Sequence, residues 1–390
     1  MFPAYLIVRS GNNCEKTKEN DDITKQNSGS RKTLDEIHSK VDNLTEDLSD
    51  TTPSDAVESF FEHKSYKGET ERGYESSLRY FVDWCELSEI EYMSDVDTDD
   101  IRRYRKWRRE AAPSRVERLS PSSITTQMKR LRVFIKHCEE MKFVSGGVSQ
   151  IINTSIDNDD EVRDEWVGSD EAEAMLDYLS KYNYASVEHV VCRILCYTGM
   201  RLGSLHSIDV TDIQLIKGKN AIHLEHRPEE GTTLKNGIDG ERYVFITQAT
   251  HQILSDYIDE NRHDVTDDYG REPLVTSQHG RCAKSTLRSY VYRCTQPCMI
   301  GQDCPLGRDP ESCDAAGKNS KAHECPEASS SHPLRKGYIT RLLKKNQSMD
   351  MISARCDVSS KMIEKHYDMR SPREEMIGRC SQVKDVMSDF

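Results

Sequence analysis

The chain has 390 residues, with 54 Lys or Arg against 67 Asp or Glu, so its formal net charge is −13. This length predicts two or three domains, and no run approaches the ~18 uncharged apolar residues of a membrane helix. The first residues lack the basic and apolar segments of a secretion signal, so we expect a cytoplasmic protein with no membrane partner. Its 13 cysteines then indicate reduced thiols or metal ligands rather than a disulfide framework.

The acidic balance does not exclude nucleic acid, because a binding groove needs only a local basic surface. Basic residues cluster at 102–109, 129–132 and 341–345, and the acid excess lies mostly outside these clusters. An acidic surface around basic patches also fits a salt-rich cytoplasm, in which simple electrostatic attraction to DNA is screened.

The N-terminal segment divides in two. Residues 1–30 are polar and without apolar periodicity, which predicts disorder. From Leu34 to Leu48 apolar residues repeat at alternating spacings of three and four, which predicts a short amphipathic helix. That helix either docks on its own domain or contacts a partner. Residues 1–50 are therefore expected to form a tail with one short helix.

Residues 52–150 have the apolar periodicity of a compact helical domain. We expect helices from Pro53, over 70–87, over 97–110 and from Ser120, with Ser54 or Asp55 as the first N-cap. The third and fourth of these helices are rich in basic residues with few acids among them. We expect them to contact DNA phosphates, although intrahelical ion pairs on a solvated face are the alternative. In the fourth, the expected contacts are Thr125, Thr126, Lys129, Arg130 and Arg132.

A glycine pair and an acidic stretch indicate a linker at 151–165. Residues 166–370 then have a mixed pattern, and 371–390 form a C-terminal tail. Strand-like segments at 221–226 and 242–246 are joined through a Gly-bounded loop, which predicts a long β-hairpin. Helices are expected over 187–198, 248–260, 285–294, 333–345, 349–356 and 359–367. The predicted fold class is mainly α with a small antiparallel β-hairpin or sheet, in two domains.

Four residues in this second region suggest chemistry on a phosphodiester. Arg201 follows an apolar helix, His332 and Arg335 lie three apart at the head of another, and Tyr367 comes last. Arginine forks bind non-bridging phosphate oxygens and neutralise charge in the transition state. A tyrosine can attack phosphorus and hold one DNA end as a phosphotyrosine. Tyr338 is a rival nucleophile, but one helical turn after Arg335 it is expected to pack in the core.

These motifs resemble those of the tyrosine recombinases, or phage-type integrases. Residues 198–205 resemble the first-arginine box, His332 to Arg335 the His-x-x-Arg box, and residues 356–367 the box that ends on the nucleophile. With the charge pattern, the likeness is to an archaeal-like member and covers about 52–370. It implies a helical core-binding domain and a mixed catalytic domain that clamp double-stranded DNA. It also implies a homo-tetramer on two duplexes and a 3′-phosphotyrosine formed without metal or ATP.

The resemblance also implies a proton donor for the leaving 5′ oxygen. That lysine lies on a β-hairpin in the family, which favours Lys235, with Lys217 and Lys219 as rivals. His332 is expected to bond a phosphate oxygen or assist proton transfer. One position departs from the pattern, since Val358 stands where the family usually has a histidine or tryptophan, preceded by Asp357 in place of glycine. Loss of that donor predicts a slower enzyme.

The resemblance leaves a cysteine-rich insertion at 294–325 unexplained. A long loop with little apolar content needs a cross-link to stay ordered, and four thiolates around a metal would supply one. The expected ligands of a structural zinc or iron–sulfur site are Cys298, Cys304, Cys313 and Cys325. Unrelated free thiols and redox regulation are the alternatives, because the spacings are irregular.

The function predicted from the sequence is site-specific DNA recombination, with a lean toward a mobile element. Two binding functions are the alternatives: a catalytically inactive DNA-binding relic of the same fold, suggested by Val358, and a metal-dependent DNA-binding regulator that uses the cysteine insertion. The sequence does not decide between integration, excision and dimer resolution. A recombinase forms a covalent complex with nicked DNA, whereas a binder only shifts it.

Overall fold

The computed structural model describes residues 48–112, 118–155, 166–368, 370–374, 376–377 and 380. These residues fall into two compact units, one before and one after residue 162. The N-terminal unit is residues 48–155 and the C-terminal unit begins at residue 166. Nearly all of the expected tail and amphipathic helix at 1–50, and most of the expected linker and C-terminal tail, lie outside the described residues.

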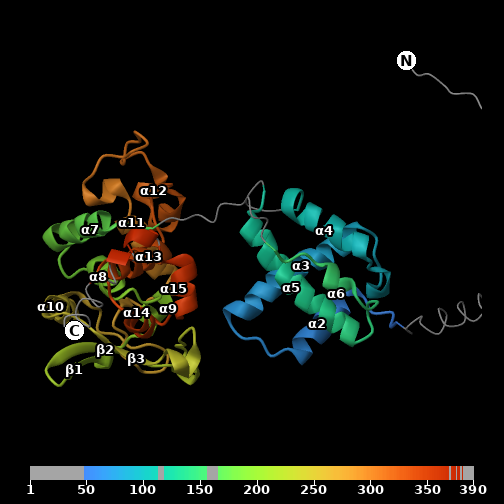
Figure 1. Cartoon of the computed structure of the whole chain (residues 1–390), viewed down its shortest axis with the longest axis horizontal. Coiled ribbons are helices and arrows are strands. Elements are labelled where there is room, and N and C mark those ends of the chain that lie inside the picture. The colour runs from blue at the N-terminus through green and yellow to red at the C-terminus, as the bar shows by residue number, and fades with distance from the viewer. Residues whose placement is uncertain are drawn as a thin grey trace, which may run out of the picture. The chain divides into compact units, whose positions relative to one another are not determined.

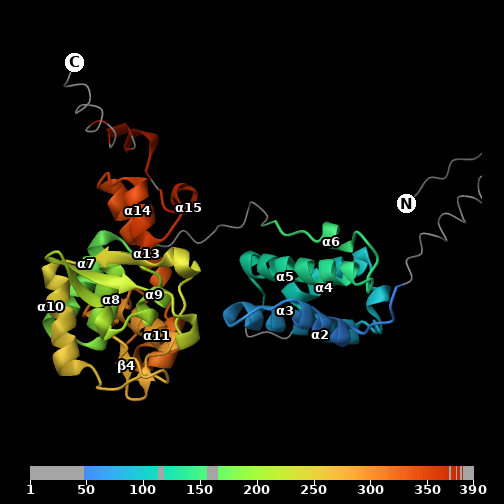
Figure 2. The same ribbon diagram turned by 90° about the horizontal axis from the view of Figure 1, so that it is seen from below.

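The secondary-structure elements of the N-terminal unit are all helices among its described residues (Figure 2). Phe134 of the long central helix packs against Phe60 and Phe81, with ring centroids 5.6 and 5.9 Å apart. These rings are fully buried and form the centre of one apolar core. The helices are α2 (Pro53–His63), α3 (Glu69–Leu87), α4 (Thr98–Glu110), α5 (Pro121–Glu140) and α6 (Val148–Ile151).

Side-chain caps start three of these helices. Thr52 caps α2 by accepting from the Asp55 N–H, so the expectation of Ser54 or Asp55 as N-cap was wrong. Pro53 follows the cap because it has no N–H to satisfy at the first helical position. Asp97 caps α4 through a capping box with Asp100, and Ser120 caps α5.

The C-terminal unit surrounds a second apolar core with helices (Figure 1). The helix α10 continues into a π-helical turn at Tyr257–Asn261, which replaces the last residues of the helix expected over 248–260. The helices are α7 (Ser169–Tyr182), α8 (Val187–Thr198), α9 (Leu202–Ser207), α10 (Gln248–Asp256), α11 (Lys284–Cys294), α12 (Asp314–Gly317), α13 (Ser331–Lys344), α14 (Met349–Cys356) and α15 (Ser360–His366).

The sheet of this unit is antiparallel in the order β1-β2-β3. Its strands are β1 (Ile213–Ile216), β2 (Lys219–Leu224) and β3 (Arg242–Phe245), and Ile222 of β2 pairs with Val244. The sequence predicted β2 and β3 but not β1, which is joined to β2 by a two-residue turn. A two-stranded ribbon, β4 (Thr276–Ser277) and β5 (Gly280–Arg281), completes the described strands. The predicted class, mainly helical with a small antiparallel sheet, is confirmed.

Among the described residues, no helix has both the length and the apolar character required to cross a membrane.

Candidate active site

A glycine turn presents Arg201 at the end of α8. Gly199 has a φ of 62° and caps the helix by donating its N–H to the Leu195 carbonyl. The ring of Tyr338 lies so close that a Cβ at position 199 would clash with it. Both the positive φ and the close approach therefore require glycine here. The chain then turns into α9, with Arg201 as its first flanking residue and its side chain 25% exposed.

Arg335 joins two boxes that are far apart in the sequence. It lies on α13 and is only 3% exposed. Its Nη1 donates to the carbonyl of Gly199 at 2.6 Å and to that of Cys356 at 2.7 Å. Gly199 ends α8 and Cys356 ends α14, so one guanidinium holds both helix termini. The structure thus brings together the segments that carry Arg201 and Asp357.

Asp357 is the acidic partner of Arg201. It ends α14 with a φ of 54°, a left-handed conformation that Asp and Asn tolerate better than most residues. Its Oδ2 accepts from Arg201 Nη1 at 2.6 Å, and its Oδ1 accepts from Asn236 Nδ2 at 2.7 Å. Arg242 Nη1 lies 4.0 Å from Oδ2. The carboxylate is therefore surrounded by two cations and an amide.

The loop between β2 and β3 reaches this cluster. Asn236, which donates to Asp357, directly follows Lys235 in the loop. Lys235 itself is exposed. The long hairpin expected from the sequence thus ends close to Arg201.

His332 lies in the first turn of α13, one turn before Arg335. Its side chain is open to solvent, but the surrounding protein atoms still desolvate it and lower the pKa of its imidazole. The positive charges of Arg335, Arg201 and Arg288 lower the pKa further. An imidazole so placed is neutral at pH 7 and can donate or accept one hydrogen bond at each nitrogen.

Tyr367 lies at the end of α15, half-buried against the apolar cluster of Tyr338 and Ile339. Its carbonyl accepts from Thr340 Oγ1 at 3.1 Å. Its hydroxyl makes no hydrogen bond to Arg201, Arg335 or any other described residue. Tyr338, the rival, is 7% exposed and accepts from Arg355 Nε at 2.6 Å, so it is a core residue.

Arg242 is a cluster member that the sequence did not suggest. It donates to the carbonyls of Gly240 at 2.7 Å and Arg355 at 3.0 Å. Its buried Nη2 has no hydrogen-bond partner among the described residues. Burial lowers the pKa of its guanidinium; Asp357 opposes the shift, and the charges of Arg335 and Arg201 add to it. No motif marks Arg242, because it opens an ordinary strand and meets the others only through tertiary contacts.

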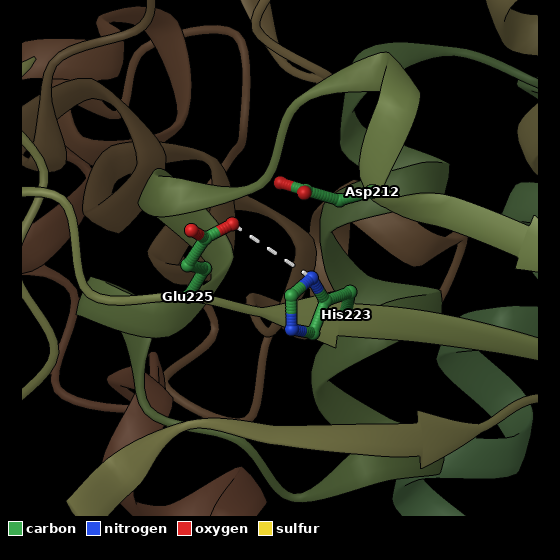
Figure 3. Close-up of side chains that lie close together, drawn as sticks. All are labelled: Asp212, His223 and Glu225. Atoms are coloured by element: carbon green, nitrogen blue, oxygen red, sulfur yellow. Dashed lines mark ion pairs between the residues drawn. The ribbon is translucent and has the colours of Figure 1, made fainter. Parts of the chain in front are cut away.

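A second acidic group, Asp212, His223 and Glu225, has the proximity of a metal site (Figure 3). Arg227 already occupies its carboxylates, with Nη2 at 2.7 Å from both Asp212 Oδ1 and Glu225 Oε2. The imidazole of His223 stacks on the Tyr243 ring, with ring centroids 4.3 Å apart. The guanidinium contacts both carboxylates and offsets one of their two negative charges, so we interpret the group as part of the ion-pair network that Arg227 forms with Asp209, Asp212 and Glu225.

The basic helices of the N-terminal unit are less open than expected. Arg108 is 4% exposed, with its guanidinium 3.6 Å from the Tyr80 ring centre. Thr125 is buried, and Arg130 donates to Ser77 Oγ at 3.1 Å. Thr125 is therefore too buried to face a phosphate, which corrects the expectation for that residue, and Arg108 and Arg130 make contacts inside the unit. The exposed basic side chains of α5 are Lys129, Arg132 and Lys136.

No protein-family model and no curated protein sequence matches the chain. Solved structures do resemble it. The Tn1549 transposon integrase in complex with transposon right end DNA has 14% identity and a TM-score of 0.60, over 84% of this chain and 98% of that one. A lambda integrase dimer bound to a COC′ core site has 14% identity and a TM-score of 0.54, over 82% and 95%. The XerH site-specific recombinase bound to a palindromic difH substrate has 14% identity and a TM-score of 0.52, over 81% and 78%.

These neighbours share both the helical content and the small antiparallel sheet of the C-terminal unit. At this identity they show the fold alone. The chain has the fold of the tyrosine recombinases.

Proposed function

We propose that this chain is a site-specific DNA recombinase that cleaves and rejoins double-stranded DNA through a covalent bond to Tyr367. The observation that carries the proposal is the placement of Arg335. Its two carbonyl bonds join the segments that carry Arg201 and Asp357 to the helix of His332, and the Lys235 loop meets Asp357 through Asn236. Segments from four parts of the sequence thus converge where a phosphate would be held. DNA-bound neighbours of the same fold support DNA as the substrate.

In the proposed reaction, Tyr367 Oη attacks the phosphorus and the P–O5′ bond breaks. Arg201 and Arg335 neutralise the phosphate oxygens as charge builds. Neutral His332 donates to a phosphate oxygen or relays the tyrosine proton. Lys235 protonates the leaving 5′ oxygen. Rejoining reverses these steps at a new DNA end, with four protomers acting on two duplexes.

A catalytically inactive DNA binder is the second candidate, and two observations favour it. The Arg201 guanidinium is paired with Asp357 at 2.6 Å, and the Tyr367 hydroxyl has no bond to either arginine among the described residues. In that case the same basic edge would hold DNA without cutting it.

Covalent trapping separates the two. Duplexes from the flanks of the protein's own gene are first selected by gel shift, and then nicked so that a cleaved strand cannot religate. Wild type is expected to give an SDS-stable protein–DNA band, and Tyr367→Phe none. Tyr338→Phe is the matched control, because it removes a hydroxyl that bonds Arg355 in the core, and it should still trap. A gel shift without a covalent band in wild type would refute the recombinase.

A further inference from the structure

The cysteine insertion has almost no apolar core of its own. Between Pro297 and Cys325 the buried side chains are three alanines, at 315, 316 and 322. Burying three methyl groups stabilises by only about 2 kcal/mol, whereas ordering each residue costs about 1–2 kcal/mol. The described helical pieces here are short: Pro297–Ile300, α12 and Asn319–Glu324. Hydrophobic burial therefore does not account for a defined conformation.

Four cysteine side chains of the insertion line a single cavity. Cys298, Cys304, Cys313 and Cys325 surround a space of about 20 Å³. The fold thus gathers around one cavity four cysteines that spread over 28 positions of the sequence.

Gln296 supplies a second and independent sign of a ligand. It is fully buried and lines the same cavity. Its Nε2 donates to the carbonyls of Ala315 and Ala322, both at 3.0 Å, so the amide orientation is fixed. Its Oε1 is buried without a hydrogen-bond partner among the described residues. A buried orphan acceptor is costly unless something polar or charged comes to occupy the space beside it.

We propose that Cys298, Cys304, Cys313 and Cys325 form a structural zinc site that closes the insertion. Four thiolates satisfy the tetrahedral preference of zinc and leave no open position for chemistry. The cavity has room for about one water-sized sphere, which suits one ion better than an iron–sulfur cluster. Among the described residues the four sulfurs do not yet lie within 4.8 Å of one another. Binding at about 2.3 Å per sulfur draws the loops inward.

The metal would act on the proposed active site through the start of α13. Ser329 follows Cys325 closely, and its N–H donates to Thr295 Oγ1 at 2.8 Å at the end of α11. The same hydroxyl donates back to the Ser329 carbonyl at 3.0 Å. Two residues later α13 begins and carries His332. Zinc is therefore expected to hold the chain in place just before α13. This effect on the active site rests on the proposed function, whereas the metal site itself does not.

The test is a metal count on the full chain, expressed with zinc and purified without chelator. Wild type is expected to hold about one zinc per chain by elemental analysis, and Cys304→Ser and Cys325→Ser to hold almost none. Cys380→Ser is the matched control, because Cys380 is exposed and lies outside the insertion, and it should keep the metal. Cys304→His replaces one zinc ligand by another and should retain zinc if Cys304→Ser fails to fold.

Thermal unfolding gives a readout that is independent of DNA cleavage. Zinc added to chelator-stripped protein should raise the midpoint of wild type and of Cys380→Ser, and leave that of Cys304→Ser unchanged. A metal-free wild type with four reactive thiols, an iron content with visible absorbance, or two disulfides would each overturn the proposal. A zinc-loaded wild type that never traps DNA would overturn the recombinase and leave the metal site standing.

Discussion

The carboxylate of Asp357 lies 2.6 Å from Nη1 of Arg201, where the proposed recombinase mechanism needs a phosphate oxygen. The Asp357 side chain is 12% exposed and that of Arg201 is 25% exposed. The pair is therefore only partly solvated but still accessible to DNA. A phosphate can bind both Nη atoms of Arg201 only if Asp357 moves away, and otherwise the two anions must share the guanidinium. The protein thus holds its own anion at the proposed DNA-binding edge.

Asp357→Asn should tighten DNA binding by about tenfold, which corresponds to roughly 1.4 kcal/mol. The change removes a negative charge beside the incoming phosphate and frees Arg201. Asn also tolerates the left-handed backbone that position 357 requires. The measurement is the dissociation constant of a nicked duplex at two salt concentrations, because an electrostatic gain shrinks as salt screens it.

Asp350→Asn is the control for net charge. It lies exposed in the first turn of the same helix, α14, and removes the same charge at a distance from Arg201. Equal tightening by both variants would mean that Asp357 acts only through overall charge and does not compete for Arg201.

Arg335 and Arg201 should differ in what their loss does to folding. Arg335→Ala leaves the Gly199 and Cys356 carbonyls without their buried donor and is expected to cost about 3 kcal/mol of unfolding free energy. Arg201→Ala removes a partly exposed partner and should cost about 1 kcal/mol. Both should abolish trapping. Urea unfolding of the two variants measures the difference, and equal losses would contradict a structural role for Arg335.

The sequence predicted local features well and tertiary pairings poorly. The bounds expected for α14, Met349–Cys356, agree with the structure because a serine cap and a left-handed terminus mark both ends. The strand β1 was missed because its four residues read as part of the preceding turn. The pairing of Arg201 with Asp357 spans 156 positions and has no periodicity, so it depends on how α8, α13 and α14 pack.

A buried ion-pair network supports the sheet and gives a third prediction. Asp209 Oδ2 lies 2.6 Å from Arg271 Nη2, and its Oδ1 lies 2.5 Å from Arg281 Nη2. Asp209→Asn leaves two buried cations short of charge and should cost about 3–5 kcal/mol. Asp264→Asn, exposed in the same unit, should change stability by less than about 0.5 kcal/mol. A small loss for Asp209→Asn in urea unfolding would show that neighbouring carboxylates compensate.

The C-terminal unit should lose stability in mild acid. Burial, assisted by Arg193, lowers the pKa of the fully buried His189 to about 4, below the unfolded value of about 6.5. Between these pH values the unfolded chain binds more protons than the folded one. The stabilisation is therefore complete above about pH 6.5 and declines as pH falls toward 4, by up to about 1.4 kcal/mol per unit.

Urea unfolding at pH 7.5 and pH 5 checks this dependence. His189→Gln removes the titrating imidazole, so the loss of unfolding free energy between the two pH values should be smaller than in wild type. His279 is an exposed histidine of the same unit, so His279→Gln should leave the loss of unfolding free energy between the two pH values unchanged. An undiminished acid loss in His189→Gln would assign the effect to other groups.

Restoring a histidine at position 358 should not restore a phosphate contact. Val358 is 8% exposed and packs with Tyr338, Ile352 and Ile363, so its side chain belongs to an apolar cluster. Val358→His buries an imidazole among these groups and should cost about 1–3 kcal/mol, with no gain in covalent DNA product. Val358→Thr, which keeps the shape and replaces one methyl group by a hydroxyl, should cost less. Thermal unfolding and trapping yield are measured together, and a higher yield from Val358→His would mean that position 358 faces the phosphate after all.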